Sequence, residues 1–254
     1  MDISWVQLGI ICLLVFFAGL VDSIAGGGGL ISVPAYFFAG IPAHFALGTN
    51  KFSAAVGTFL STLRFIKNKR YHLQAALVSI VSAFIGSALG ARLVLEMDER
   101  VIQIVLVITL PVIGIYLMTK RGFGKEEKKN LPMAKVILLS ILSAFLIGAY
   151  DGFYGPGTGT LLILFYTGFI GFDLTTASGN AKIVNLTSNI AALITFIIHG
   201  KVLFFIGIPA AICSMAGHWI GSGLAIKNGA KVIRPVFIAV FVGLMLKIVY
   251  DIFM

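Results

Sequence analysis

Two acidic residues in this sequence each precede a glycine-rich run within apolar surroundings. Asp22 comes before the four glycines 26–29, and Asp151 comes before Gly-Pro-Gly-Thr-Gly at 155–159. Glycine destabilises a helix interior by about 1 kcal/mol relative to alanine, so both runs predict a helix break. The N–H groups freed there, together with the positive end of the helix that follows, can bind an anion. The two positions therefore predict an anion site beside carboxylates.

The carboxylates admit two roles. An ionisable group at membrane depth is costly, which favours a function such as proton coupling or gating. A carboxylate can equally cap a broken helix by accepting hydrogen bonds from its free N–H groups. Direct contact with an anionic substrate would be repulsive. We therefore predict that Asp22 and Asp151 are coupling or gating residues and not substrate ligands.

A lysine follows each break in a short polar stretch. Gly-Thr-Asn-Lys ends at Lys51, and Gly-Asn-Ala-Lys ends at Lys182. Lysine binds anions, and neighbouring Thr and Asn side chains can donate to an oxyanion. Alternatively, the lysines extend to the lipid headgroups or pair with the two aspartates. The predicted substrate-binding residues are Gly26, Gly27, Gly28, Gly29, Thr49, Asn50, Lys51, Gly155, Gly157, Thr158, Gly159, Asn180 and Lys182.

Other polar residues have weaker support from the sequence. Asn185 corresponds to Ala54 in the first half, so the internal repeat described below does not support it. His218 lies in an apolar run, where a hydrogen-bonded packing role is favoured over a proton relay. For four further polar residues, hydrogen bonds between helices are as good an explanation as a place along the substrate path. They are Ser53, Thr58, Ser188 and Asn189.

The elements that position these residues are membrane helices. Of the 254 residues, 59% are hydrophobic and only 11% are charged, and the mean hydropathy is +1.03. Apolar segments run about 4–22, 28–40, 46–66, 73–95, 100–119, 134–150, 157–171, 177–198, 202–226 and 231–252. The sequence thus predicts an all-α, multi-pass protein of the inner membrane. Most of its net charge of +9 lies in short connections, as membrane topology requires, and does not indicate nucleic acid.

The two halves of the chain repeat. Asp22 aligns with Asp151 at an offset of 129 residues, and Lys51 aligns with Lys182 at an offset of 131. Residues 120–133 form a hydrophilic cytoplasmic linker between an N-terminal repeat, 1–119, and a C-terminal repeat, 134–254. Each repeat has about five helical segments, and we expect their glycine breaks to meet at the bilayer midplane.

Basic connections near residues 67–70, 120–129 and 227–234 indicate an odd number of crossings in each half, which inverts the second repeat relative to the first. Segments 28–40 and 157–171 are too short to span the membrane unaided, and they either span or re-enter. Both alternatives preserve the inversion. Inverted repeats with broken helices are typical of secondary transporters.

Several classes of function lack the residues they need. The sequence has no cluster with metal-ligand spacing, no phosphate-binding loop of the Walker type and no nucleophile elbow. We therefore expect neither a cofactor nor enzymatic activity. The expected partners are a small anionic substrate and the lipid bilayer, without nucleic acid, and the oligomeric state stays open.

These motifs resemble a known family. Asp-Ser-Ile-Ala-Gly-Gly-Gly-Gly at 22–29, Gly-Thr-Asn-Lys at 48–51 and the degenerate copies at 151–160 and 177–182 are similar to the sulfite exporter TauE/SafE family. The resemblance covers essentially the whole chain, and it implies a permease for sulfur-containing anions. The second copy departs from the first, because Gly27 becomes Pro156 and Asn50 becomes Ala181. The two half-sites are therefore not equivalent.

The expected function is secondary transport by alternating access of a small sulfur-containing anion, such as sulfite, sulfoacetate or another organosulfonate. The alternatives are a passive anion channel, or a carrier of a different small ion including a metal cation. A channel would need polar residues along its whole path, whereas here they concentrate at two breaks. The direction of transport and the coupling ion stay open.

Overall fold

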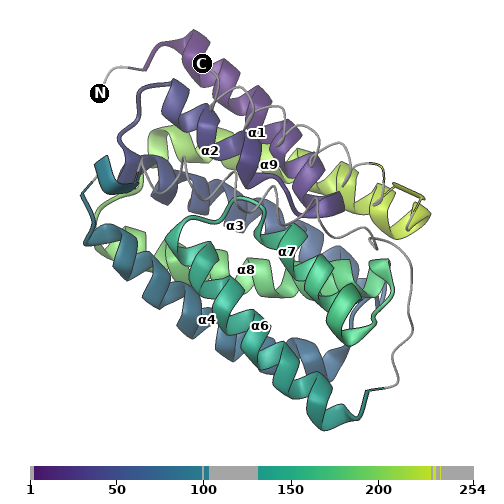
Figure 1. Cartoon of the computed structure of the whole chain (residues 1–254). Helices are drawn as coiled ribbons and strands as arrows, with labels where there is room; N and C mark the ends of the chain where they lie inside the picture. Colours follow the sequence, from purple (N-terminus) through teal and green to yellow (C-terminus); the bar gives the residue numbers. More distant parts are fainter. Residues whose placement is uncertain (1–2, 99, 103–130, 230, 233–234, 236–254) are drawn as a thin grey trace, which may run out of the picture.

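The computed structural model describes residues 3–98, 100–102, 131–229, 231–232 and 235, and all of its regular elements in those ranges are helical (Figure 1). The expectation of an all-α fold is confirmed for this part of the chain. Most of the predicted segments 100–119 and 231–252 and of the linker 120–133 lies outside the described residues. The helices are α1 (Trp5–Ala25), α2 (Gly29–Phe38), α3 (Ala43–Lys67), α4 (Leu73–Leu95), α6 (Met133–Phe153), α7 (Thr158–Phe165), the π-helical turn η1 (Tyr166–Ile170), α8 (Leu174–Ile198) and α9 (Phe204–Asn228).

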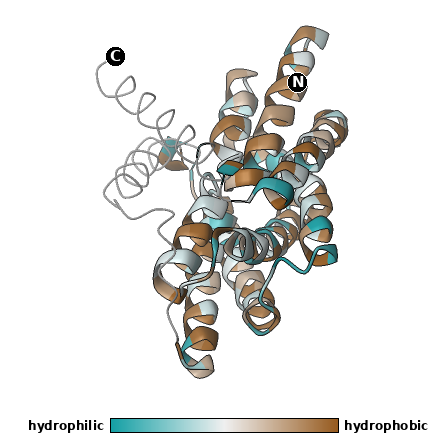
Figure 2. Ribbon diagram, turned by 90° about the vertical axis from the view of Figure 1, so that its right-hand side faces the viewer, coloured by the Kyte–Doolittle hydropathy of each residue, from teal (hydrophilic) through white to brown (hydrophobic). Residues whose placement is uncertain are grey.

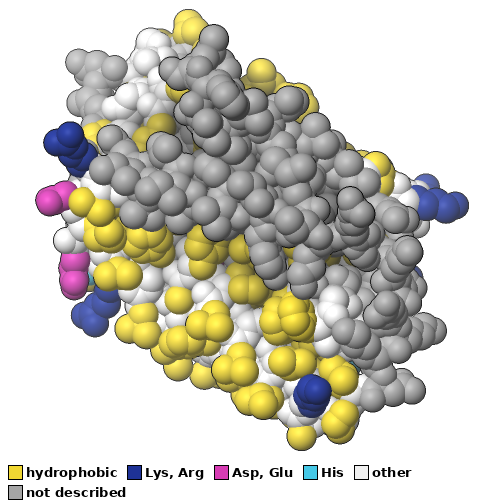
Figure 3. Space-filling model, in the orientation of Figure 1, with side chains coloured by type: hydrophobic (Ala, Val, Ile, Leu, Met, Phe, Trp, Pro, Cys, Tyr) yellow, Lys and Arg dark blue, Asp and Glu magenta, His cyan; other side chains and the backbone are white. Residues whose placement is uncertain are grey.

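Five of these helices are long and apolar enough to cross a membrane: α1, α4, α6, α8 and α9. Their outward faces carry large exposed apolar side chains, such as Leu77 and Val81 on α4 and Leu146 on α6. Figure 2 shows hydrophobic residues along the outer helices, and Figure 3 shows charged side chains near the ends of the molecule with an apolar field between them. This distribution suits a protein that is surrounded by lipid.

The first glycine run ends α1 as the sequence predicts. A capping box between Ser4 and Gln7 starts the helix, and Gly26 ends it with a φ of 81°, a conformation that favours glycine. The short helix α2 then returns alongside α1. Its start lies against Ala18 and Asp22, while Tyr36 near its end packs in one cluster with Leu8 and Ile11.

The second glycine run forms a similar hairpin from α6 and α7. Helix α6 ends at Phe153, and Gly155 and Gly157 take φ values of 99° and 82°. The returning arm ends near the start of α6, because Tyr166 bonds Ser79, which in turn donates to the carbonyl of Ser140. Helix α2 has 10 residues, and α7 with η1 has 8 and 5, so the two arms are about 15 and 20 Å long and shorter than a hydrocarbon core of about 30 Å. Segments 28–40 and 157–171 therefore fold back and do not span.

Two long helices, α3 and α8, run antiparallel through the middle of the fold (Figure 1). Lys51 contacts Asn189, and Thr62 further along α3 contacts Lys182 earlier in α8. Around this pair, α1 packs on α9 and α4 packs on α6. Small residues allow both contacts, since a Cβ at Gly90 or Gly217 would overlap a backbone carbonyl of the facing helix. These glycines therefore form the packing seams of α4 against α6 and of α1 against α9.

Candidate functional site

The tips of the two hairpins touch each other. A Cβ atom at Gly26 would overlap the backbone of Gly159, and one at Gly159 would lie against Gly26 in return. The backbone N–H of Thr160 donates to the carbonyl oxygen of Gly26 at 3.2 Å, and its hydroxyl donates to the carbonyl of Ala25 at 2.8 Å. Gly26 and Gly159, 133 positions apart in the chain, thus allow the two segments to meet backbone to backbone.

Beside the tips, two buried ion pairs connect the halves of the chain. The Nζ atom of Lys182 lies 3.0 Å from Asp22 Oδ2, and that of Lys51 lies 2.9 Å from Asp151 Oδ2. Each lysine therefore pairs with the aspartate of the other half. Only 2% of the Lys51 side chain and none of the Lys182 side chain is exposed. The alternative in which the lysines extend to the headgroups is excluded by this burial.

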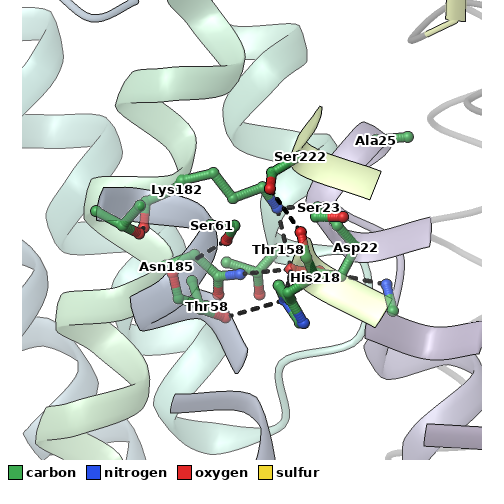
Figure 4. Close-up of polar contacts among 12 residues, drawn as sticks. Asp22, Ser23, Ala25, Thr58, Ser61, Thr158, Lys182, Asn185, His218 and Ser222 are labelled. Carbon is green, nitrogen blue, oxygen red and sulfur yellow. Dashed lines mark hydrogen bonds and ion pairs between the residues drawn. The ribbon is translucent and has the colours of Figure 1, made fainter. Parts of the chain in front are cut away.

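A chain of amides links the two ion pairs. Lys51 Nζ donates to Asn189 Oδ1 at 3.0 Å, Asn189 donates to Asn185 Oδ1 at 3.1 Å, and Asn185 donates to Asp22 Oδ2 at 3.4 Å. Figure 4 shows Asn185 pointing from α8 toward Asp22, with Lys182 approaching the same carboxylate. A change at one ion pair can thus alter the other through three consecutive hydrogen bonds.

The two carboxylates have different further partners. Asp22 Oδ1 accepts a hydrogen bond of 3.3 Å from the N–H of Gly28, which is the capping contact considered above. Its Oδ2 atom lies 3.3 Å from Nε2 of His218 on α9. Asp151 instead accepts from the hydroxyl of Ser188 at 2.6 Å. An imidazole therefore stands beside the first carboxylate, whereas a hydroxyl stands beside the second.

These groups surround one cavity of about 40 Å³, which is room for a few waters or a small solute. Ten of the fifteen residues predicted from the sequence line it: Asp22, Gly26, Gly28, Gly29, Asn50, Lys51, Asp151, Gly155, Thr158 and Gly159. Five lie outside the lining: Gly27, Thr49, Gly157, Asn180 and Lys182.

Three of those five have contacts that maintain the fold. Thr49 accepts a hydrogen bond from the N–H of Leu203 at the start of α9, and Asn180 donates to a carbonyl within its own helix. Lys182 donates to both the backbone carbonyl and the carboxylate of Asp22. Lys182 therefore stabilises the C-terminal end of α1 and does not line the cavity.

Several lining residues had weak or no support from the sequence. They are Val15, Ala18, Gly19, Ser32, Ser53, Ala54, Thr58, Asn185, Asn189, Ser214 and His218. Asn185 and Asn189 lie three and seven residues after Lys182, so all three share one face of α8. This polar stripe on an apolar helix could have predicted Asn185 and Asn189 from the sequence. Comparison of the two halves hid it, because Asn185 corresponds to Ala54. Among the described residues, no group of His, Cys, Asp and Glu side chains is arranged to hold a metal ion.

Comparison with known proteins gives the family. A family model described as sulfite exporter TauE/SafE matches residues 11–248. The chain belongs to this family. It is a multi-pass membrane protein and a membrane transporter, as the resemblance implied, and the family assignment and the membrane location are confirmed.

Named relatives cover nearly the whole chain. It is 34% identical to a probable membrane transporter protein of Haemophilus influenzae over 99% of this chain and 98% of that protein. It is 35% identical to the probable membrane transporter protein YfcA of Escherichia coli K12 over 98% of this chain and 92% of that protein. A third relative, the probable membrane transporter protein YunE of Bacillus subtilis, is 21% identical over 95% of this chain. No solved structure matches the chain.

Proposed function

We propose that this TauE/SafE member is a secondary transporter that moves a small sulfur-containing anion across the inner membrane by alternating access. The observation that carries the proposal is the convergence of both glycine tips and both lysine–aspartate pairs on one buried cavity. A carrier needs a site that both halves build, because their relative motion then changes access to it.

We further propose that residues 1–119 and 134–254 are two inverted repeats. Helix α3 of the first repeat and α8 of the second run antiparallel, as two copies related by an axis in the membrane plane would. The ion pairs also support the repeat, since each lysine pairs with the aspartate of the other half. In the same way, α1 of the first half packs on α9 of the second, and α6 of the second half packs on α4 of the first. The cavity then lies near the bilayer midplane.

For the bound anion we assign Lys51 as the principal cation. It is the lysine whose side chain reaches the cavity lining in the described part of the chain. Its ammonium group has three donors, of which Asp151 and Asn189 occupy two directions. A substrate oxygen takes the remaining direction, or displaces the carboxylate, which keeps its bond from Ser188.

The other assigned ligands are small donors around the cavity. Asn50 offers its side-chain amide, Thr158 can turn its hydroxyl to the anion from the carbonyl of Gly155, and the glycines of both tips expose backbone to the same space. A cavity of about 40 Å³ favours a compact oxyanion such as sulfite over a long organosulfonate, unless the cavity widens during the cycle. The size thus ranks the substrates for testing.

The direct test is flux into proteoliposomes with sulfite, thiosulfate, sulfoacetate, taurine and sulfate as the panel. We expect saturable transport of at least one sulfur anion and competition by the others. Lys51→Met should abolish this flux, and the double variant Lys51→Met/Asp151→Asn removes the unpaired charge so that folding is retained. Lys67→Met, on the same helix but exposed, is the matched control and should transport normally. If the wild-type protein moves no anion of the panel, the proposal is wrong.

A further inference from the structure

The charges around the cavity cancel before any substrate enters. Asp22 pairs with Lys182, and Asp151 pairs with Lys51, all four being buried. The one further titratable side chain among the described residues of the lining is His218. A bound monoanion would therefore leave a negative charge without compensation in a buried site, which is strongly unfavourable.

From this balance we infer that His218 takes up one proton for each monoanion bound, so that substrate and proton occupy the cavity together. This inference rests on the proposed function and adds the coupling ion. It assigns the two half-sites different tasks: Lys51 and its neighbours hold the anion, and the His218–Asp22 pair holds the proton.

The surroundings of His218 can satisfy both the neutral and the cationic ring. Nδ1 lies 3.0 Å from the carbonyl oxygen of Ser214, which accepts, and 3.3 Å from the hydroxyl of Ser214, which can donate. Nε2 lies 3.3 Å from Asp22 Oδ2 and 3.5 Å from the hydroxyl of Thr58. The cationic ring donates from Nε2 to the carboxylate and from Nδ1 to the carbonyl, whereas the neutral ring keeps the bond to the carboxylate and accepts the Ser214 hydroxyl at Nδ1.

The charged groups on the helices around α9 matter for this role, because another ion beside the ring of His218 would change the charge balance. Asp22 is the charged group that faces the ring from α1, and α3 presents the uncharged Thr58. The other charges of α3 turn elsewhere, since Lys51 pairs with Asp151 and Arg64 donates to the carbonyl of Trp219. From α8, Lys182 reaches the ring only through Asp22.

The second half-site has no equivalent proton carrier. At the offset of 131 residues the counterpart of His218 is Ser87. Its hydroxyl donates to the carbonyl of Ser188, whose own hydroxyl donates to Asp151. Protonation of His218 also adds a charge without breaking either lysine–aspartate pair, whereas protonation of an aspartate would break one. The structure thus supports one proton per cycle.

The test measures proton uptake during anion binding to the purified wild-type protein. The probes are methanesulfonate and ethanesulfonate, monoanions whose charges stay constant from about pH 5.5 to 8.5, the range in which histidine titrates. We expect about one proton taken up per anion, and an affinity that weakens as the pH rises, by up to about tenfold per pH unit, because binding then requires a proton from solution. His218→Gln should remove both effects, while the matched variant His199→Gln, at the exposed end of α8, should retain them.

The outcomes separate the two proposals. Binding without proton uptake and with the same affinity at every pH overturns the coupling and leaves anion transport standing. An unchanged pH dependence in a folded His218→Gln protein also overturns the assignment. Absence of binding by either probe, together with absence of flux for the whole panel above, overturns the proposed function and the coupling with it. If His218→Gln does not fold, proton uptake by the wild type decides alone.

Discussion

The contact between the hairpin tips predicts a large difference between two glycine substitutions. Gly26 and Gly40 both have positive φ values, 81° and 76°. A Cβ atom at Gly26 would overlap the backbone of Gly159 and Thr160, whereas one at Gly40 would meet nothing within 4 Å. Replacement by alanine therefore tests the tip contact and holds the backbone conformation nearly constant.

The magnitudes follow from the contacts. Alanine in a left-handed conformation costs about 1–2 kcal/mol at either position. At Gly26 the tips must also separate, which breaks the two hydrogen bonds that Thr160 makes to the first tip. At about 1 kcal/mol for each bond, Gly26→Ala should destabilise by about 3–4 kcal/mol and Gly40→Ala by about 1–2 kcal/mol.

The assay is reversible unfolding in mixed micelles, with SDS as the denaturant and helical circular dichroism as the signal. Gly26→Ala should shift the midpoint to clearly lower SDS than Gly40→Ala, and it should also reduce transport, since the tips line the cavity. Equal losses of stability in the two variants would refute the reasoning, because the backbone conformation would then account for the whole effect.

Three further predictions concern the buried polar network. Lys182→Met should destabilise by about 3–5 kcal/mol because it leaves a buried carboxylate unpaired, and the added change Asp22→Asn should recover most of this in the same SDS titration. A single variant as stable as wild type would contradict the buried pair. Asn185→Ala should lower the initial rate of anion flux by about tenfold, because it cuts the link between the ion pairs, and should cost about 1–3 kcal/mol of stability, because the buried Asn189 amide loses its acceptor; wild-type flux would show that the link is dispensable. Thr160→Val should cost about 1 kcal/mol through loss of its bond between the hairpins, whereas Thr187→Val, whose hydroxyl bonds its own helix, should cost less, and the reverse order would argue against the contact.

Local sequence was sufficient for the helices and their breaks. Eight of the ten predicted segments match described helices to within a few residues, because in a membrane a long apolar run satisfies its backbone hydrogen bonds as a helix. Likewise, four consecutive glycines lower helix stability enough to end α1 wherever the rest of the chain lies. The repeat placed an aspartate, a glycine run and a lysine in each half, which was enough to nominate ten of the cavity-lining residues.

The sequence did not show which lysine of one half pairs with which aspartate. Both pairings of the lysines with the aspartates fit the sequence equally well, and the packing of α3 against α8 selects the exchanged one. The repeat placed Lys51 and Lys182 at corresponding positions, yet Lys51 lines the cavity and Lys182 bonds the end of α1 outside the lining. Small differences in helix position decide this, because a lysine side chain is long enough to reach either place.

The sequence by itself determined that this chain is a helical membrane protein with two glycine-broken helical regions, an acid beside each break and a lysine after it. Tertiary structure decided which acid each lysine meets, that Asn185 and Asn189 join the two pairs, and that His218 stands beside Asp22. The physical reason is the distance along the chain over which each kind of interaction acts. Helix propensity and hydrophobicity act over a few residues, whereas a hydrogen bond between α1 and α9 depends on the packing of every helix between them.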